Sequence, residues 1–181
     1  SGVAASTVMI TSGANDSAGE IFLTPYTAIT LAEYFRDLGR DVLLVIDDMT
    51  THAKYYRELA LLSRKFPGRD SYPGDIFHIH SKLLERAGNF TTGSITCLPL
   101  AETQMGDITG YIQTNLMSMT DGHIYFDSEL FFAGRRPAID PFLSVTRVGR
   151  QTQNPLQKDI SSRLLIMLSD YEKITRFVKF G

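Results

Sequence analysis

The first two thirds of the chain alternate between short apolar runs and longer segments in which apolar residues recur at helical spacing. Short runs of this kind predict buried strands, and the periodic segments predict amphipathic helices. The predicted strands are residues 6–11 (STVMIT), 42–47 (VLLVID) and 93–100 (GSITCLPL). The predicted helices are residues 25–39, 51–65 and 75–87, with Pro25 in the first turn and Gly39 at the end of the first helix. Strands that alternate with helices favour right-handed parallel units.

The remaining third of the chain changes pattern. Residues 116–127 (LMSMTDGHIYFD) predict two short strands joined around Asp121-Gly122, and a further short strand is predicted near residues 143–147. From about residue 155 the apolar residues return to helical spacing. We therefore expect an α/β fold with a mostly parallel sheet flanked by helices, an antiparallel hairpin and a short C-terminal helical segment.

Composition narrows the class of protein without identifying it. The chain has 181 residues, 43% of them hydrophobic, and a formal net charge of -2. This charge gives no reason to expect a nucleic-acid partner, and no apolar run approaches the ~20 residues that span a membrane. The single cysteine, Cys97, lies in a predicted strand, so we expect a buried, unpaired thiol of the kind found in reducing compartments.

The segment VLLVIDDMT, residues 42–50, places two aspartates directly after a predicted strand. A carboxylate at this position in a nucleotide site helps to hold Mg²⁺ beside the phosphates, because Mg²⁺ prefers hard oxygen ligands. The usual companion is the phosphate loop G-x-x-x-x-G-K-[ST], and the chain contains no Gly-Lys pair. Asp47 is the candidate metal ligand. An equally weighted alternative is that Asp47 or Asp48 caps the following helix.

Five stretches together resemble the alpha subunit of F-type rotary ATP synthases, in the order and spacing of that family. They are residues 33–50 (EYFRDLGRDVLLVIDDMT), 67–88 (PGRDSYPGDIFHIHSKLLERAG), 93–115 (GSITCLPLAETQMGDITGYIQTN), 118–139 (SMTDGHIYFDSELFFAGRRPAI) and 143–150 (LSVTRVGR). The B subunit of V-type ATPases shares the PGR…YPG and ERAG pieces, but the later stretches are closer to the F-type alpha chain.

The resemblance begins downstream of the family's phosphate loop and stops partway into its C-terminal helical domain. It implies that residues 1–150 form part of a RecA-like nucleotide-binding domain and that residues 151–181 begin the helical domain. We therefore expect a part of the larger subunit, which accounts for a strand-end aspartate without a Gly-Lys loop.

The resemblance implies that Arg147 reaches across a subunit interface into the catalytic site of a neighbouring beta subunit. An arginine supplied in this way stabilises the charge that develops on the transferred phosphoryl group. Ser118 matches a serine that lines the same interface. Taken alone, the residue pattern favours an exposed arginine or a surface ion pair for Arg147, and Ser118 is equally a hairpin residue without a role.

A second set of residues is implied for the alpha subunit's own, non-catalytic nucleotide. Arg136 and Pro137 match residues that pack against the adenine, and Glu102 is expected near the same nucleotide. The alternatives are a turn with an exposed arginine and a polar loop residue. The implied cofactors in the intact subunit are ATP or ADP with Mg²⁺, bound weakly or not at all by this chain alone.

The implied partners are beta subunits and the central gamma shaft, which the loop Pro67–Asp75 is expected to face, with Asp107 on the same surface. The complex would be peripheral, on the cytoplasmic face of a membrane, and would couple ATP synthesis to ion transport without membrane insertion by this chain. His78 and His80 are expected to point apart, and the four histidines form no expected metal site. The alternatives are a standalone binding or scaffold module, and a V-type or other RecA-fold ATPase relative.

Overall fold

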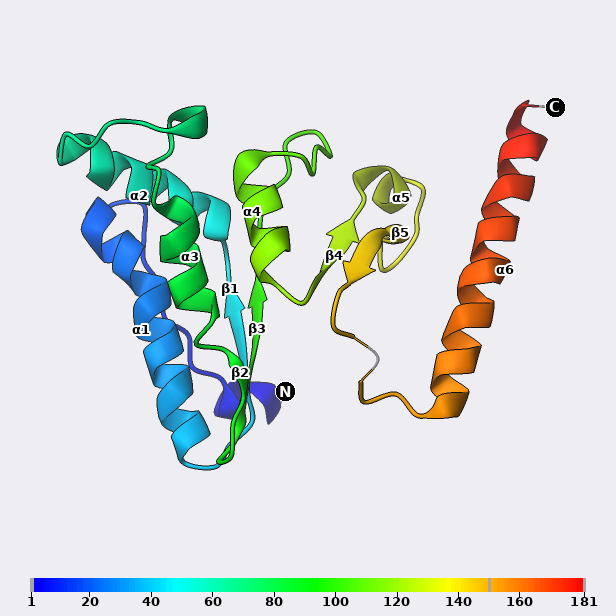
Figure 1. The fold of residues 1–181 in the computed structure, drawn as a ribbon, viewed down its shortest axis with the longest axis horizontal. Helices are drawn as coiled ribbons and strands as arrows, with labels where there is room; N and C mark the ends of the chain where they lie inside the picture. Colours follow the sequence, from blue (N-terminus) through cyan, green and yellow to red (C-terminus); the bar gives the residue numbers. More distant parts are fainter. Residues whose placement is uncertain (1, 150, 181) are drawn as a thin grey trace. The chain divides into compact units, whose positions relative to one another are not determined.

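The structure is a computed structural model that describes residues 2–149 and 151–180. The chain divides into two compact units, Ser1–Met119 and Thr120–Gly181 (Figure 1). None of the helices in the described ranges is long and apolar enough to cross a membrane. Each unit carries a different part of the candidate site.

The first unit contains a three-stranded sheet in the order β1-β3-β2. β1 (Val42–Ile46) runs parallel to β3 (Ser94–Pro99), with Leu44 opposite Cys97, and the short β2 (Gly88–Asn89) is antiparallel to β3. The helices of this unit are η1 (Gly2–Ser6), α1 (Ala18–Asp37), α2 (Met49–Leu62), η2 (Arg69–Ser71), α3 (Ile76–Leu84) and α4 (Tyr111–Met119). The predicted parallel α/β arrangement is confirmed in this unit.

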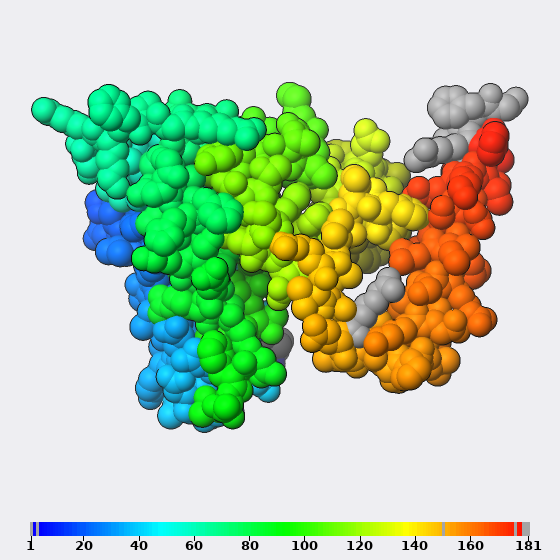
Figure 2. All heavy atoms as spheres, in the orientation of Figure 1, coloured from blue at the N-terminus to red at the C-terminus, as the bar shows by residue number. Residues whose placement is uncertain are grey.

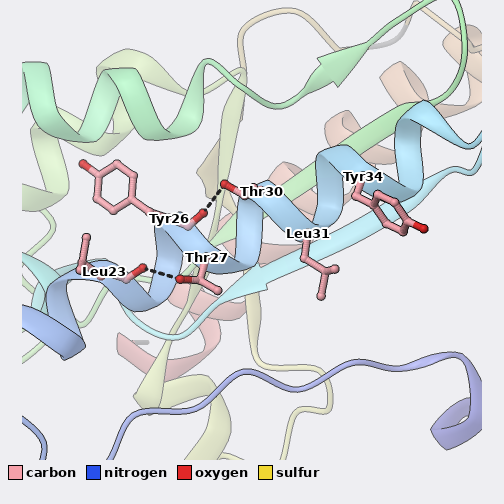
Figure 3. A pocket seen from close by; sticks show the side chains of 6 residues that line it. All are labelled: Leu23, Tyr26, Thr27, Thr30, Leu31 and Tyr34. Atoms are coloured by element: carbon pink, nitrogen blue, oxygen red, sulfur yellow. Dashed lines mark hydrogen bonds between the residues drawn. The ribbon is translucent and has the colours of Figure 1, made fainter.

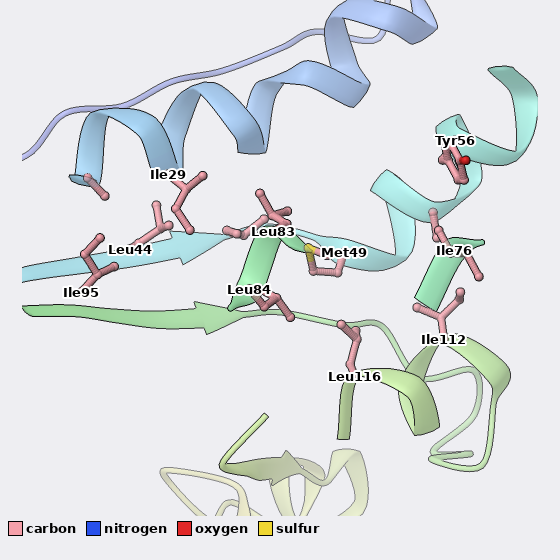
Figure 4. Close-up of a cluster of buried hydrophobic side chains, with 13 residues drawn as sticks. Ile29, Leu44, Met49, Tyr56, Ile76, Leu83, Leu84, Ile95, Ile112 and Leu116 are labelled. Atoms are coloured by element: carbon pink, nitrogen blue, oxygen red, sulfur yellow. The ribbon is translucent and has the colours of Figure 1, made fainter. Parts of the chain in front are cut away.

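One face of the sheet carries the core. Figure 4 shows Ile29 of α1 close to Leu44 of β1 and Ile95 of β3, and all three side chains are buried. Met49 at the start of α2 and the α3 residue Leu83 are fully buried in the same cluster. Burying each large aliphatic side chain stabilises the fold by about 1.5–3 kcal/mol.

The opposite face of β1 is open. Leu43 and Val45 are exposed while Leu44 and Ile46 are buried, so the side chains alternate as in a half-buried strand. The sequence predicted a strand buried on both faces, and the structure buries one.

Two predicted elements of the first unit are wrong. Residues 6–11 were predicted as a buried strand, but Ser6 ends η1, residues 7–11 adopt no regular structure, and Val8 and Met9 are exposed. Residues 116–119 were predicted as the first strand of a hairpin, but they form the last turns of α4, with Ile112 and Leu116 buried one turn apart. A segment with high β-propensity forms a strand only when a neighbouring strand pairs with it. Residues 116–119 are helical because the buried apolar face of α4 stabilises that helix.

The first helix begins earlier than predicted. Ser17 and Glu20 form a capping box, in which Glu20 N–H donates to Ser17 Oγ at 3.3 Å and Ser17 N–H donates to the Glu20 carboxylate at 2.9 Å. This cap satisfies the exposed donors of the first turn and places Pro25 inside the helix.

The loop Pro67–Asp75 lies at the surface of the first unit, in the region coloured teal in Figure 2. It contains η2 and an antiparallel bridge between Pro67 and Pro73, and Gly68 N–H donates to Tyr72 O at 2.7 Å. Backbone hydrogen bonds within the loop therefore hold its two ends together.

The second unit is built on an antiparallel pair, β4 (Gly122–Phe126) and β5 (Ile139–Thr146). α5 (Ser128–Phe132) lies between them in sequence, and α6 (Pro155–Phe180) follows. The antiparallel hairpin and the C-terminal helix are confirmed, although the partner of β4 is β5 and not residues 116–119. On α6 the expected apolar residues Ile160, Leu164 and Leu165 are exposed.

Candidate functional site

The carboxyl ends of β1 and β3 meet at one edge of the first unit. Because the strands are parallel and adjacent, the segments that leave them are brought together. Leu100 N–H donates to Ile46 O, and Met49 N–H donates to Leu100 O, both at 2.9 Å. These two bonds join the start of α2 to the segment that leads toward Glu102.

The two aspartates after β1 have different surroundings. Asp48 is the N-cap of α2: its Oδ1 accepts from Thr51 N–H at 2.6 Å, and its Oδ2 accepts from the Thr51 hydroxyl at 3.0 Å. Asp47 is exposed at the end of the strand. The capping alternative therefore applies to Asp48, and the Asp47 carboxylate is accessible to solvent at the strand end.

Glu102 is held beside the first turns of α2. Its backbone N–H donates to the Thr50 hydroxyl at 3.0 Å, its carbonyl accepts from the Gln113 side chain, and its carboxylate lies 3.5 Å from Lys54 Nζ. The Glu102–Lys54 pair is exposed and contributes little stability. Asp47 and Glu102 thus leave neighbouring strands at the same edge of the sheet.

Ser118 lies in the last turn of α4 and not on a hairpin strand. Its side chain is exposed, and its hydroxyl donates to Asn115 O at 2.7 Å. The local bond to the helix backbone sets the position of the hydroxyl on the surface of the first unit.

Arg136 and Pro137 lie before β5 in the second unit and line a shallow pocket of about 420 Å³ with Phe126, Asp127, Ser128, Phe131 and Ala138. The Arg136 guanidinium carbon lies 3.5 Å from the centroid of the Phe131 ring. Arg136 Nη1 donates to Phe131 O at 2.6 Å and to Arg135 O at 2.8 Å. The guanidinium plane is therefore oriented over an aromatic ring, an arrangement that cation–π attraction favours.

Arg147 directly follows β5 and is exposed. Its backbone N–H donates to Asp121 O at 2.7 Å, and its Nη1 donates to Thr120 O at 3.4 Å. Both contacts join Arg147 to the residues that precede β4. The backbone of Arg147 is thus fixed at one end of the β-pair while its guanidinium remains at the surface.

Another hollow lies away from the predicted site residues. It has a volume of about 500 Å³ and lies on one face of α1, lined by Leu23, Tyr26, Thr27, Thr30, Leu31 and Tyr34. Figure 3 shows the Thr27 and Thr30 hydroxyls bonded to the backbone of the preceding turn, so neither is directed at a ligand. None of the predicted site residues lines it, and it carries no charged group that would bind a phosphate.

Two further features concern the titratable residues. Across residues 2–149 and 151–180, no cluster of three or more His, Cys, Asp or Glu side chains is arranged to hold a metal. Cys97 is half-buried on β3, and burial raises the pKa of its thiol to about 11. His78 is exposed and His80 is fully buried, so they point apart as predicted.

The sequence pattern does not indicate one buried contact, because the contact joins residues far apart in the chain. The imidazoles of His52 and His80 meet in the core with Nδ1 and Nε2 3.1 Å apart. They come from α2 and α3 and are separated by 28 positions, so no local spacing indicates the contact.

Residues 1–146 match the family described as ATP synthase alpha/beta family, nucleotide-binding domain. The chain is 50% identical over 179 residues to ATP synthase subunit alpha of Mycoplasma capricolum and 48% identical over 179 residues to that of Acholeplasma laidlawii, each alignment covering 97% of this chain. It is 45% identical over 185 residues, 100% of its length, to ATP synthase subunit alpha of Ehrlichia ruminantium. The chain spans 34–36% of the length of these relatives.

Proposed function

Because this chain belongs to the ATP synthase alpha/beta family, we propose that it serves as part of the nucleotide-binding domain of a non-catalytic, regulatory alpha subunit in an F-type rotary ATP synthase. The observation that carries the proposal is identity of 45–50% over nearly the whole chain to proteins named ATP synthase subunit alpha. Within the subunit, this chain supplies side chains to two nucleotide sites.

Arg147 acts in trans. Its guanidinium is exposed at the end of β5, and its backbone is anchored by the bond to Asp121 O at 2.7 Å. In the assembled ring this side chain enters the catalytic site of a neighbouring beta subunit and stabilises negative charge on the transferred phosphoryl group. Its planar, permanently charged fork of donors suits that task. Ser118, exposed on α4, contributes a hydroxyl to the same interface.

Arg136 and Pro137 cover the adenine of the alpha subunit's own nucleotide. The pocket beside them is apolar apart from Arg136, Asp127 and Ser128, and the guanidinium already presents a flat face above Phe131. A planar cation and a proline ring both pack well against a purine base. Such a pocket holds the base without contributing a group that would cleave the phosphates.

Asp47 contributes to a Mg²⁺ site with ATP or ADP in the intact subunit. Mg²⁺ keeps several waters and takes one or two carboxylates together with substrate phosphates, so a single exposed carboxylate at a strand end fits it. When bound, the ion neutralises phosphate charge. Glu102 lies at the same edge and adds negative charge near the nucleotide, where its Thr50 and Gln113 contacts fix the backbone.

The loop Pro67–Asp75 faces the central gamma shaft. Its internal backbone hydrogen bonds and its exposed position suit a rigid surface that contacts a rotating partner. Beta subunits flank the chain, and the complex is peripheral to a membrane across which ions move.

The test is to replace the matching segment of a full-length bacterial alpha subunit with residues 1–181 and to assemble the chimaera with beta and gamma subunits. We expect ATP turnover within about 10-fold of the parent complex, because the replaced segment is homologous. A chimaera that assembles but has no turnover would contradict the proposal. In parallel, MgATP titration calorimetry of the isolated chain should show no binding at millimolar nucleotide, and micromolar binding would favour an independent binding module.

A further inference from the structure

The pair formed by His52 and His80 joins three helices of the first unit. His52 Nδ1 lies 3.1 Å from His80 Nε2, and His52 Nε2 lies 3.2 Å from the carbonyl oxygen of Phe22. Phe22 belongs to α1, His52 to α2 and His80 to α3. Both imidazoles are buried, with 3% and 0% of their surface exposed. One continuous line of hydrogen bonds therefore crosses the helical layer.

The chemistry of the two contacts fixes the position of every proton. A carbonyl oxygen only accepts, so His52 Nε2 must carry a hydrogen that it donates to Phe22 O. Neutral His52 then has an acceptor at Nδ1, which requires His80 Nε2 to carry a hydrogen and donate it. His80 Nδ1 is left as an acceptor, and it has no partner within the described residues. The neutral pair thus has one tautomer arrangement.

The surroundings of the pair are aromatic. The Phe22 ring stacks on His52 with centroids 4.9 Å apart, and Tyr56 stacks on Phe22 at 5.3 Å. Among titratable side chains, the Tyr26 ring of α1 lies 6.1 Å from the His52 ring, and Tyr56 of α2 contacts Phe22; burial raises the pKa of both phenols. Glu33 of α1 and Arg86, which follows α3, are paired with each other at 2.5 Å. No carboxylate among these groups compensates a buried imidazolium.

Adding a proton leaves a buried N–H without an acceptor. A proton on His52 Nδ1 either faces the N–H of His80 Nε2 or shifts that hydrogen to His80 Nδ1, where no acceptor lies. If His80 Nδ1 is protonated, a buried donor appears where no acceptor lies. Burial accordingly lowers the pKa of His52 to about 4, and burial together with the neighbouring His52 lowers that of His80 to about 3.

The pair is rigidly connected to the strand-end carboxylates. His52 N–H donates to Asp48 O at 3.1 Å in the first turn of α2, and Asp48 is the N-cap that follows Asp47. A shift of His52 would therefore move the first turn of α2 and the segment that carries Asp47.

We propose that His52 and His80 are positioning residues that, only while both are neutral, hold the first turn of α2 and so place Asp47 for Mg²⁺-nucleotide. This inference rests on the proposed function for the role of Asp47, whereas the tautomer arrangement stands independently of it. The partner in the proposed action is the Mg²⁺ of a bound nucleoside di- or triphosphate.

The first experiment is ¹⁵N nuclear magnetic resonance of the imidazoles in the 181-residue chain. We expect both histidines to show the Nε2–H form and to stay neutral from pH 7.5 down to about pH 5. His78, exposed two positions from His80, serves as the internal control for a solvent-accessible imidazole. An Nδ1–H form of His52, or titration of either buried imidazole near 6.5, would overturn the proposal whatever the function of the protein.

The second experiment measures the Mg²⁺ concentration that half-saturates ATP binding in the full-length chimaera. Replacing His52→Leu removes both hydrogen bonds and should raise that concentration about 10-fold, in the range seen when groups that orient metal ligands are lost. His52→Gln keeps one acceptor and one donor and should restore it to within about 2-fold, and the control His78→Gln should not change it. If His52→Leu does not fold, His80→Gln takes its place. Equal Mg²⁺ dependence in a folded variant and the parent would overturn the positioning role, whereas a parent chimaera that binds no Mg²⁺-nucleotide would instead refute the proposed function.

Discussion

Arg136 and Arg147 lie at opposite ends of the same strand, β5, one before Ile139 and the other after Thr146. An eight-residue strand spans on the order of 20 Å, even where a bulge shortens it. Two guanidinium groups held this far apart cannot contact one phosphate. The two arginines should therefore serve two different nucleotides, and their substitutions should have separable effects.

Removing the Arg147 guanidinium should abolish turnover while sparing binding. In the assembled chimaera we expect Arg147→Ala to lower steady-state ATP hydrolysis by about 10³-fold or more, because charge on the transferred phosphoryl group loses its stabilisation. Nucleotide affinity, measured by titration of a fluorescent analogue, should change less than about 3-fold. Arg135→Ala is the matched control, since Arg135 is an exposed arginine at the other end of β5. Turnover that survives Arg147→Ala would refute the assignment.

Removing the Arg136 guanidinium should act on base binding. Arg136→Ala loses the face that Phe131 orients, and we expect adenine-nucleotide affinity at the non-catalytic site to fall about 3- to 30-fold, the range of a partly desolvated cation–π contact. Catalytic turnover at saturating ATP should stay within about 3-fold of the parent. The measurement is equilibrium binding of adenine and guanine nucleotides, and identical loss of both would show that the base is not what Arg136 recognises.

Substitution of Asp48 should have the larger effect on stability, and substitution of Asp47 should have the larger effect on Mg²⁺-dependent nucleotide binding. Asp48→Ala removes the cap bond to Thr51 N–H and should lower the free energy of unfolding by about 1 kcal/mol in urea. Asp47→Ala removes an exposed carboxylate and should change the free energy of unfolding by less than about 0.5 kcal/mol. In Mg²⁺-dependent nucleotide binding by the full-length subunit, Asp47→Ala should be the more damaging. Equal effects of both variants in both assays would contradict this division of work.

Stability of the first unit should fall in mild acid. The pKa of His52 is lowered by burial from 6.5 to about 4, so between these values the unfolded chain binds more protons than the folded chain. The contribution is fully present above about pH 6.5 and is lost as the pH falls toward 4, by about 1.4 kcal/mol for each pH unit while the folded imidazole stays neutral.

Urea unfolding between pH 4.5 and 7.5 measures this slope. His52→Gln, which has no titrating group, should reduce it, and His78→Gln is the matched control at an exposed position. The carboxylates whose pKa values are lowered, such as those of Glu33 and Asp75, give a slope of the same sign at lower pH. An unchanged slope in His52→Gln would show that His52 is not the source.

The sequence predicted best those elements whose pattern is set by their own residues. The strand at 42–46 and the helix after it follow from an apolar run, a capping aspartate and helical spacing, all of them local. The stretch 6–11 carries the same apolar signal, but a strand also needs a partner, and pattern alone does not supply one. Residues 116–119 were misassigned because the helical period that begins at Ile112 extends past the start of the apparent hairpin.

The candidate site divides in the same way. The strand-end position of Asp47 could be predicted, because parallel strands deliver their carboxyl ends to one edge. The sequence could not predict which aspartate caps α2, because Asp47 and Asp48 are the same residue type at adjacent positions. Only the hydrogen bond from Thr51 N–H identifies Asp48 as the cap. The contact between His52 and His80 depends on how α2 and α3 pack, which no single segment encodes.

Cys97 can serve as a natural probe of local unfolding. It is the only cysteine, and it lies half-buried on β3, the central strand of the sheet. With its pKa raised to about 11, very little thiolate is present at neutral pH, so a disulfide reagent reacts mainly when the strand becomes exposed. The labelling rate of this single thiol therefore depends on how often β3 becomes exposed to solvent. It measures local unfolding of the sheet without an engineered probe.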